Sequence, residues 1–364
     1  MKIEPFKLER WLPGKVSRYS IGGACVKPLC FSELTDHFDL GLEVEYGSTK
    51  GDAELRQKVS ALYPGTTAED VLITIGTAEA NFLALSCLLD EGDEFAVVTP
   101  SYMGSLGIAL WLGAKVKAFR LKEEDGYKLN LEQFQGLIGK RTKVVFVTNP
   151  NNPTSTKLSD SEMRGICDIA KEVGAYVVCD EALAGLELDG IQAVSPPSIY
   201  EKGVSTGSLS KLGLPGLRLG WLVARKDIAD ACWTYKDYTS LGIPVLTEYF
   251  GNIALEKKNH EKIVQRARKI LRTNVAILMD WIHRNSAYLS CMEPKAGATA
   301  FPKYNAKLDS ASFCEQLLAE ESVQVSPGDA FDVPKHFRLR YGGVDEKTLA
   351  QALTHVETFL RRLS

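Results

Sequence analysis

Short runs of apolar and β-branched residues alternate with longer stretches of helical periodicity through the first two thirds of the chain. Apolar runs of four to six residues bounded by turn residues predict buried strands. Strands that alternate with helices favour an α/β fold, in which a mostly parallel sheet has helices on both faces. The predicted strands are 71–75, 95–98, 115–119, 144–148, 176–179 and 219–223, and the predicted helices between them are 76–89, 104–112 and 160–173.

The pattern becomes mainly helical after residue 227, and apolar residues recur at helical spacing over 256–284. We expect one long helix there, followed by a smaller α+β domain with strands near 323–331 and 337–341. The predicted organisation is an N-terminal arm that forms part of the small domain, a large domain, and the small domain. Their boundaries are 1–40, 41–255 and 256–364.

Composition narrows the possible function classes. The 364 residues are 45% hydrophobic and 24% charged, with a net charge of −3, which gives no basic excess for a nucleic-acid partner. The charged start resembles no signal peptide and no apolar run suits a transmembrane helix, so we expect a cytoplasmic protein without membrane contact. The eight cysteines contain no Cys-x-x-Cys pair, and we therefore expect no metal site.

One lysine stands in an unusual position for that residue type. Lys211 follows Ser208 and Ser210 and precedes a glycine-rich turn and Arg218, between two predicted buried segments. A lysine held out of bulk water can form a Schiff base with a carbonyl cofactor. The hydroxyls and the guanidinium could hold a phosphate. The alternative is that Lys211 caps a loop and Arg218 is a surface charge, because such short motifs occur by chance.

Two other junctions carry groups suited to a ligand. A strand leads through Gly76 into Thr77 and Ala78 at the start of a helix, where free backbone N–H groups favour a phosphate. Asp180 ends the strand 176–179, at the edge of a parallel sheet where ligands bind. Either feature alone is common in α/β proteins.

The order and spacing of the motifs resemble a known family. Residues 149–155, Asn-Pro-Asn-Asn-Pro-Thr-Ser, closely match Asn-Pro-x-Asn-Pro-Thr-Gly, and Tyr46-Gly47 followed by Leu55-Arg56 matches a second signature. Over nearly its whole length the chain resembles the aminotransferase class I/II family of fold-type-I pyridoxal-phosphate (PLP) enzymes, similar to aspartate aminotransferases. The resemblance implies a large domain, a smaller α+β domain, and a homodimer with shared active sites.

The resemblance also implies roles for individual residues. Lys211 would hold PLP and act as the catalytic base, and Asp180 would pair with the pyridine nitrogen. Tyr102 would stack on the ring, and Asn152 would donate to its phenolic oxygen. The phosphate would be held by Gly76, Thr77, Ala78, Ser208, Arg218 and, from the neighbouring subunit, Tyr46. The substrate would contact Arg338, Asn152 and Gly22, with Arg338 holding the α-carboxylate as a planar fork.

Three positions depart from the family pattern. Leu183 replaces the usual tyrosine donor to the phenolic oxygen, Ser155 replaces a glycine, and the turn between Lys211 and Arg218 differs in length. The favoured function is amino-group transfer between an L-amino acid and a 2-oxo acid. The departure at Leu183 keeps a second possibility open, a PLP-dependent lyase, cyclase, racemase or oxidase. A non-catalytic PLP-binding regulator is the third.

We predict that Lys211 forms the Schiff base with the cofactor, because it alone combines the Ser-x-Ser-Lys context with the family's spacing from Asp180. Reduction of the holoenzyme with borohydride, followed by peptide mapping, should label this lysine. Label on any other lysine would contradict the prediction.

Overall fold

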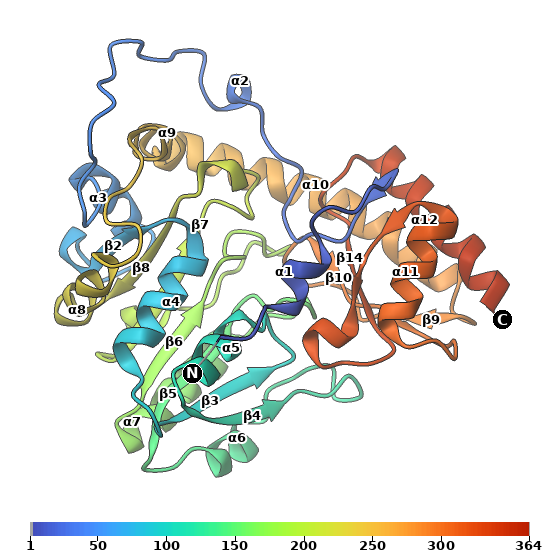
Figure 1. Ribbon diagram of the computed structural model, residues 1–364, viewed down its shortest axis with the longest axis horizontal. Coiled ribbons are helices and arrows are strands. Elements are labelled where there is room, and N and C mark those ends of the chain that lie inside the picture. Colours follow the sequence, from blue (N-terminus) through green and yellow to red (C-terminus); the bar gives the residue numbers. More distant parts are fainter. Residues whose placement is uncertain (1–2, 364) are drawn as a thin grey trace.

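A seven-stranded sheet forms the centre of the molecule in the computed structural model, which describes residues 3–363 (Figure 1). The strand order is β2-β8-β7-β6-β5-β3-β4, and all neighbours are parallel except those of β8. The predicted α/β class is therefore confirmed. The strands are β2 (Val71–Thr74), β3 (Glu94–Thr99), β4 (Lys115–Arg120), β5 (Thr142–Thr148), β6 (Tyr176–Asp180), β7 (Gly203–Ser208) and β8 (Gly220–Ala224).

Apolar side chains point to both faces of this sheet, which explains its continuous apolar runs. On β5, Val144 and Phe146 belong to the core under α4, α5 and α8, whereas Val145 and Val147 belong to the core under α6 and α7. The covering helices are α4 (Gly76–Leu88), α5 (Gly104–Trp111), α6 (Leu131–Leu137), α7 (Asp160–Val173) and α8 (Lys226–Lys236), with α3 (Ala53–Ser60) and α9 (Val245–Leu255) beside β2 and β8.

The C-terminal third is built on the long helix α10 (Lys257–Arg284), which begins one residue after the predicted start and ends as predicted. It carries short strands and two helices: β9 (Leu289–Ser290), β10 (Thr299–Ala300), β11 (Lys303–Tyr304), β12 (Val323–Gln324), β13 (Ser326–Pro327), β14 (Phe337–Arg340), α11 (Ser310–Glu321) and α12 (Glu346–Leu363). The short 3-10 helices are η1 (Ala68–Asp70), η2 (Pro196–Ser198), η3 (Pro215–Leu217) and η4 (Gly328–Phe331).

The N-terminal arm is ordered and joins the C-terminal third. It contains α1 (Lys7–Trp11), α2 (Phe31–Leu34) and β1 (Tyr19–Ser20), which pairs in parallel with β12. In Figure 1, α1 lies between α5 and the orange elements of the C-terminal third, and the chain between α2 and α3 loops away from the body. The division of the chain into domains at residues 40 and 255 stays a prediction.

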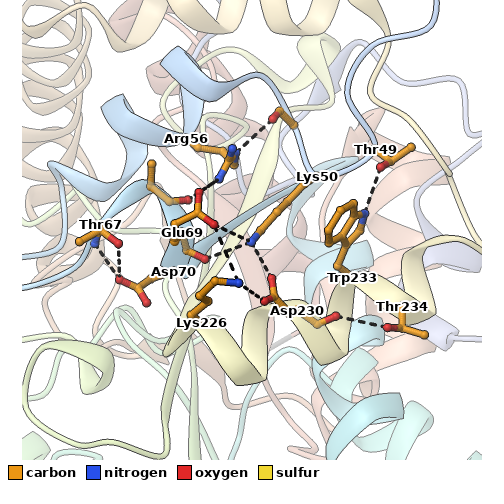
Figure 2. Close-up of polar contacts among 12 residues, drawn as sticks. Thr49, Lys50, Arg56, Thr67, Glu69, Asp70, Lys226, Asp230, Trp233 and Thr234 are labelled. Atoms are coloured by element: carbon orange, nitrogen blue, oxygen red, sulfur yellow. Dashed lines mark hydrogen bonds and ion pairs between the residues drawn. The ribbon is translucent and has the colours of Figure 1, made fainter.

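A group of ion pairs fixes the segment that follows the outlying loop (Figure 2). The Lys50 Nζ lies 2.6 Å from the Asp230 Oδ1 on α8 and 3.7 Å from the Glu69 Oε2 on η1. Arg56 of α3 also pairs with Glu69, and Lys226 pairs with Asp230. Because Lys50 is only 7% exposed, its charge depends on these carboxylates for its stability in the fold.

We predict that Lys50→Met lowers the free energy of unfolding by about 1–2 kcal/mol, because it removes a charged hydrogen bond from a buried group. Lys226→Met is the matched control, since Lys226 is exposed and contacts the same carboxylate, and it should cost no more than about 0.5 kcal/mol. Urea unfolding of the two variants measures both values. An equal decrease in the free energy of unfolding for both variants would show that the burial of Lys50 does not strengthen its contribution to stability.

Candidate active site

The carboxyl ends of the parallel strands meet at the buried carboxylate of Asp180, the last residue of β6. Asn81 of α4 donates its Nδ2–H to Asp180 Oδ2 at 2.7 Å, and the Ala182 backbone N–H donates to Oδ1 at 3.0 Å. Thr206 of β7 donates to the amide oxygen of Asn81 at 2.7 Å, which fixes the orientation of that amide. Burial raises the pKa of Asp180. A cationic ligand nitrogen would compensate that cost.

Asp180 lines a cavity of about 480 Å3. Lys211, just beyond the end of β7, lines the same cavity. Its Nζ lies 3.7 Å from the Sγ of Cys25, and its backbone oxygen accepts the N–H of Val26. The arm therefore packs directly against the lysine. Ser208 and Ser210 line this cavity too.

The end of the cavity formed by the start of α4 and Arg218 is suited to an anion. Gly76 starts α4 with a φ of +76°, and a Cβ added there would lie 2.5 Å from the Arg218 Nη2. The guanidinium thus rests against the positive end of the helix, so Arg218 reaches this end of the cavity although its turn departs from the family pattern. The buried Thr77 hydroxyl has no partner within the described part of the chain, and both it and Ala78 line the cavity.

Arg338 of β14 is buried at 2% exposure beside the cavity. It donates to the Asn152 Oδ1 at 3.2 Å and to the Gly22 backbone oxygen at 2.6 Å, while its Nε is buried without a partner among residues 3–363. Burial lowers the pKa of Arg338 to about 10. A carboxylate ligand would neutralise this guanidinium, and the three sequence-predicted substrate residues come together here.

Asn152, Tyr102 and Leu183 also line the cavity. Because the Asn152 carbonyl oxygen accepts from Arg338, its Nδ2 remains as a donor for a ligand. Leu183 is 4% exposed and offers no polar atom at the position where the family has a tyrosine. Ser155 adopts a φ of +58°, which accounts for the family's glycine at this turn.

Together these groups fit pyridoxal phosphate. The helix start with Arg218 and the free Thr77 hydroxyl suits a phosphate, Asp180 suits a protonated ring nitrogen, and Lys211 suits the aldehyde. All of them line one cavity.

Tyr46 does not reach this cavity. It is 94% exposed and lies in the loop between α2 and α3. The predicted contact of Tyr46 is with the phosphate in a neighbouring subunit, so it stays a prediction.

Asn81, Glu9 and Cys25 were not predicted from the sequence, although all three line the cavity. Asn81 had a weak signal, as a polar residue inside the apolar helix 76–89 and one turn after Thr77. Glu9 and Cys25 had none, because the path of the arm depends on tertiary packing.

No helix among residues 3–363 is long and apolar enough to cross a membrane. The same residues contain no group of three or more His, Cys, Asp or Glu side chains placed to hold a metal ion.

Comparisons with known proteins agree with this geometry. The model of the family "Aminotransferase class I and II" matches residues 33–356. Capreomycidine synthase of Streptomyces vinaceus is 30% identical over 81% of this chain and 76% of its own, and aspartate aminotransferase of Thermotoga maritima is 28% identical over 87% and 84%.

Solved structures agree as well. A PLP-dependent aminotransferase from Streptococcus suis superposes with a TM-score of 0.94 at 32% identity, over 100% of this chain and 99% of that one. The PLP-dependent cyclase OrfR superposes with a TM-score of 0.90 at 26% identity, over 100% and 99%. The chain therefore belongs to the aminotransferase class I and II family of pyridoxal-phosphate-dependent enzymes.

Proposed function

We propose that Lys211, Asp180 and Arg338 carry the amino-group transfer of this PLP-dependent aminotransferase, with an amino acid as donor and a 2-oxo acid as acceptor. The observation that carries the proposal is that Lys211 and Asp180 share one cavity with the anion-binding end formed by Thr77 and Arg218. When bound, the cofactor supplies the electron-withdrawing ring that stabilises negative charge at the substrate α-carbon.

Each residue then has a separate task. Lys211 would take the proton from the substrate α-carbon through its Nζ as general base, and would then donate that proton as general acid. Asp180 keeps a proton on the ring nitrogen, and Asn81 holds its carboxylate in place. Arg338 binds the α-carboxylate in a water-poor position, where a charged hydrogen bond is strongest.

A cyclisation is the second candidate reaction. Two observations favour it: Leu183 has no hydroxyl, and two similar proteins are a capreomycidine synthase and the PLP-dependent cyclase OrfR. A cyclase would convert an amino acid without consuming a 2-oxo acid, so the two reactions differ in their stoichiometry.

We also propose that the chain forms a homodimer with shared active sites in the cytoplasm. Tyr46 is 94% exposed, and the apolar Leu40 and Val44 in the same loop are 90% and 86% exposed. An exposed apolar segment of this kind supports a protein interface. The Lys50 ion pairs hold its C-terminal end, so the loop projects from a fixed base.

We predict that the holoenzyme exchanges amino groups between amino acids and 2-oxo acids. Arg338→Ala should lower kcat/KM for amino acids, and the loss should correspond to about 2–5 kcal/mol of transition-state stabilisation. A simple amine with the same side chain should be almost unaffected, because it lacks the carboxylate. Arg340→Ala is the control on the same strand, since Arg340 instead donates to the Ser20 backbone oxygen.

Keto-acid exchange followed by chromatography measures both rates. Equal losses for the amino acid and the amine would show that the carboxylate is bound elsewhere. Conversion of the amino acid without consumption of 2-oxo acid would favour the cyclase.

We predict that Tyr46 acts in the active site of the neighbouring subunit. Mixing Tyr46→Phe protein with Lys211→Ala protein should restore part of the activity, because one site of each hybrid dimer contains both native residues. Activity is measured after subunit exchange, and native mass spectrometry counts the hybrids. Hybrids that form but stay inactive would contradict a role in trans.

A further inference from the structure

The charges of the cavity leave one carboxylate without a task in the proposed function. Within the described part of the chain, four charged side chains line the cavity of about 480 Å3: Glu9, Asp180, Lys211 and Arg218. The last three serve the cofactor in the proposed function. Glu9 therefore remains for the substrate.

Among residues 3–363, the side chain that holds Glu9 is that of Tyr102, which is uncharged. The Tyr102 hydroxyl donates to the Glu9 Oε1 at 3.0 Å. No lysine, arginine or histidine among residues 3–363 forms an ion pair with Glu9. Burial raises the pKa of Tyr102 most, and the negative charge of Glu9 raises it further. The same charge stabilises the protonated form of the buried Arg338 guanidinium.

The helix that carries Glu9 is anchored by two apolar residues that precede it, Phe6 and Leu8. Leu8 is 1% exposed and packs with Phe301 and Phe331 of the C-terminal third. Phe6 packs edge-on against the ring of Tyr102, with the ring centroids 4.9 Å apart. This packing fixes the backbone of the helix, and the exposed side chain of Glu9 lies at the edge of the cavity, where it accepts from Tyr102.

A second cavity of about 500 Å3 continues from this point. It shares Glu9, Tyr102 and Asn81 with the first and lies between α1, α5 and η4. A long substrate side chain thus has space beyond Tyr102. The charged residues along this second cavity are Glu4, Lys7, Glu9, Asp329 and Asp332, so acidic groups predominate.

We propose that Glu9 is a specificity-determining residue that binds the cationic end of a long amino-acid side chain, a guanidinium or an ammonium group. Arg338, with its buried and unpartnered Nε, marks the carboxylate end of the same substrate. This inference rests on the proposed function, in which Arg338 binds the α-carboxylate.

Binding of unreactive analogues to the holoenzyme tests the inference directly. δ-Guanidinovalerate and its uncharged isostere δ-ureidovalerate lack an amino group, so calorimetry measures recognition without reaction. The guanidino compound should bind at least about tenfold more tightly, since a charged hydrogen bond is stronger than a neutral one. Glu9→Gln should remove most of this difference. Glu132→Gln is the control, because Glu132 of α6 lines neither cavity, and it should leave the difference unchanged.

Equal affinities for the two analogues, or an equal loss for both in Glu9→Gln, would overturn the assignment of Glu9. Exchange of arginine, citrulline and aspartate with a 2-oxo acid separates this failure from failure of the proposed function. If citrulline or aspartate exchanges and arginine is not preferred, the proposed cationic substrate class is wrong but the proposed aminotransfer still holds. Absence of exchange with every donor would count against the proposed function, whereas the calorimetric result for Glu9 would still stand or fall independently.

Discussion

A carboxylate buried at the end of a parallel strand is the constraint to which the rest of this active site is fitted. Asp180 is 4% exposed, and an ionised group in that position needs strong donors. Asn81 provides one, and Thr206 in turn orients Asn81. This chain of hydrogen bonds joins α4, β6 and β7, so the same contacts that satisfy the carboxylate also set the start of α4 and its anion-binding end.

The N-terminal arm closes the site from the other side. Cys25 contacts Lys211, Gly22 accepts from Arg338, and Glu9 accepts from Tyr102. The residues that these contacts join are 186, 316 and 93 positions apart in the chain. A segment with little regular structure of its own is therefore part of the active site, because packing in the C-terminal third gives it a fixed path.

Polar contacts also decide which groups remain available to ligands. Asn152 uses its carbonyl oxygen for Arg338 and keeps its amide hydrogens, while Thr77 keeps its whole hydroxyl. Leu183 contributes only shape. The chemistry of the cavity thus comes from partly satisfied donors beside a fully held carboxylate, an arrangement that favours an anionic cofactor with a cationic ring.

The sequence by itself determined the α/β class, most of the strands and helices of the large sheet, and the family. Buried parallel strands have continuous apolar runs, and the motifs around Asn152, Asp180 and Lys211 are local in the chain. The rule that ligands bind at the carboxyl ends of such strands pointed to Asp180, and the resemblance to the family predicted that Lys211 shares its site. Only the tertiary structure decided that Arg218 rests on Gly76 and that Glu9 enters the cavity. Both depend on long-range packing, and no local periodicity or turn chemistry encodes it.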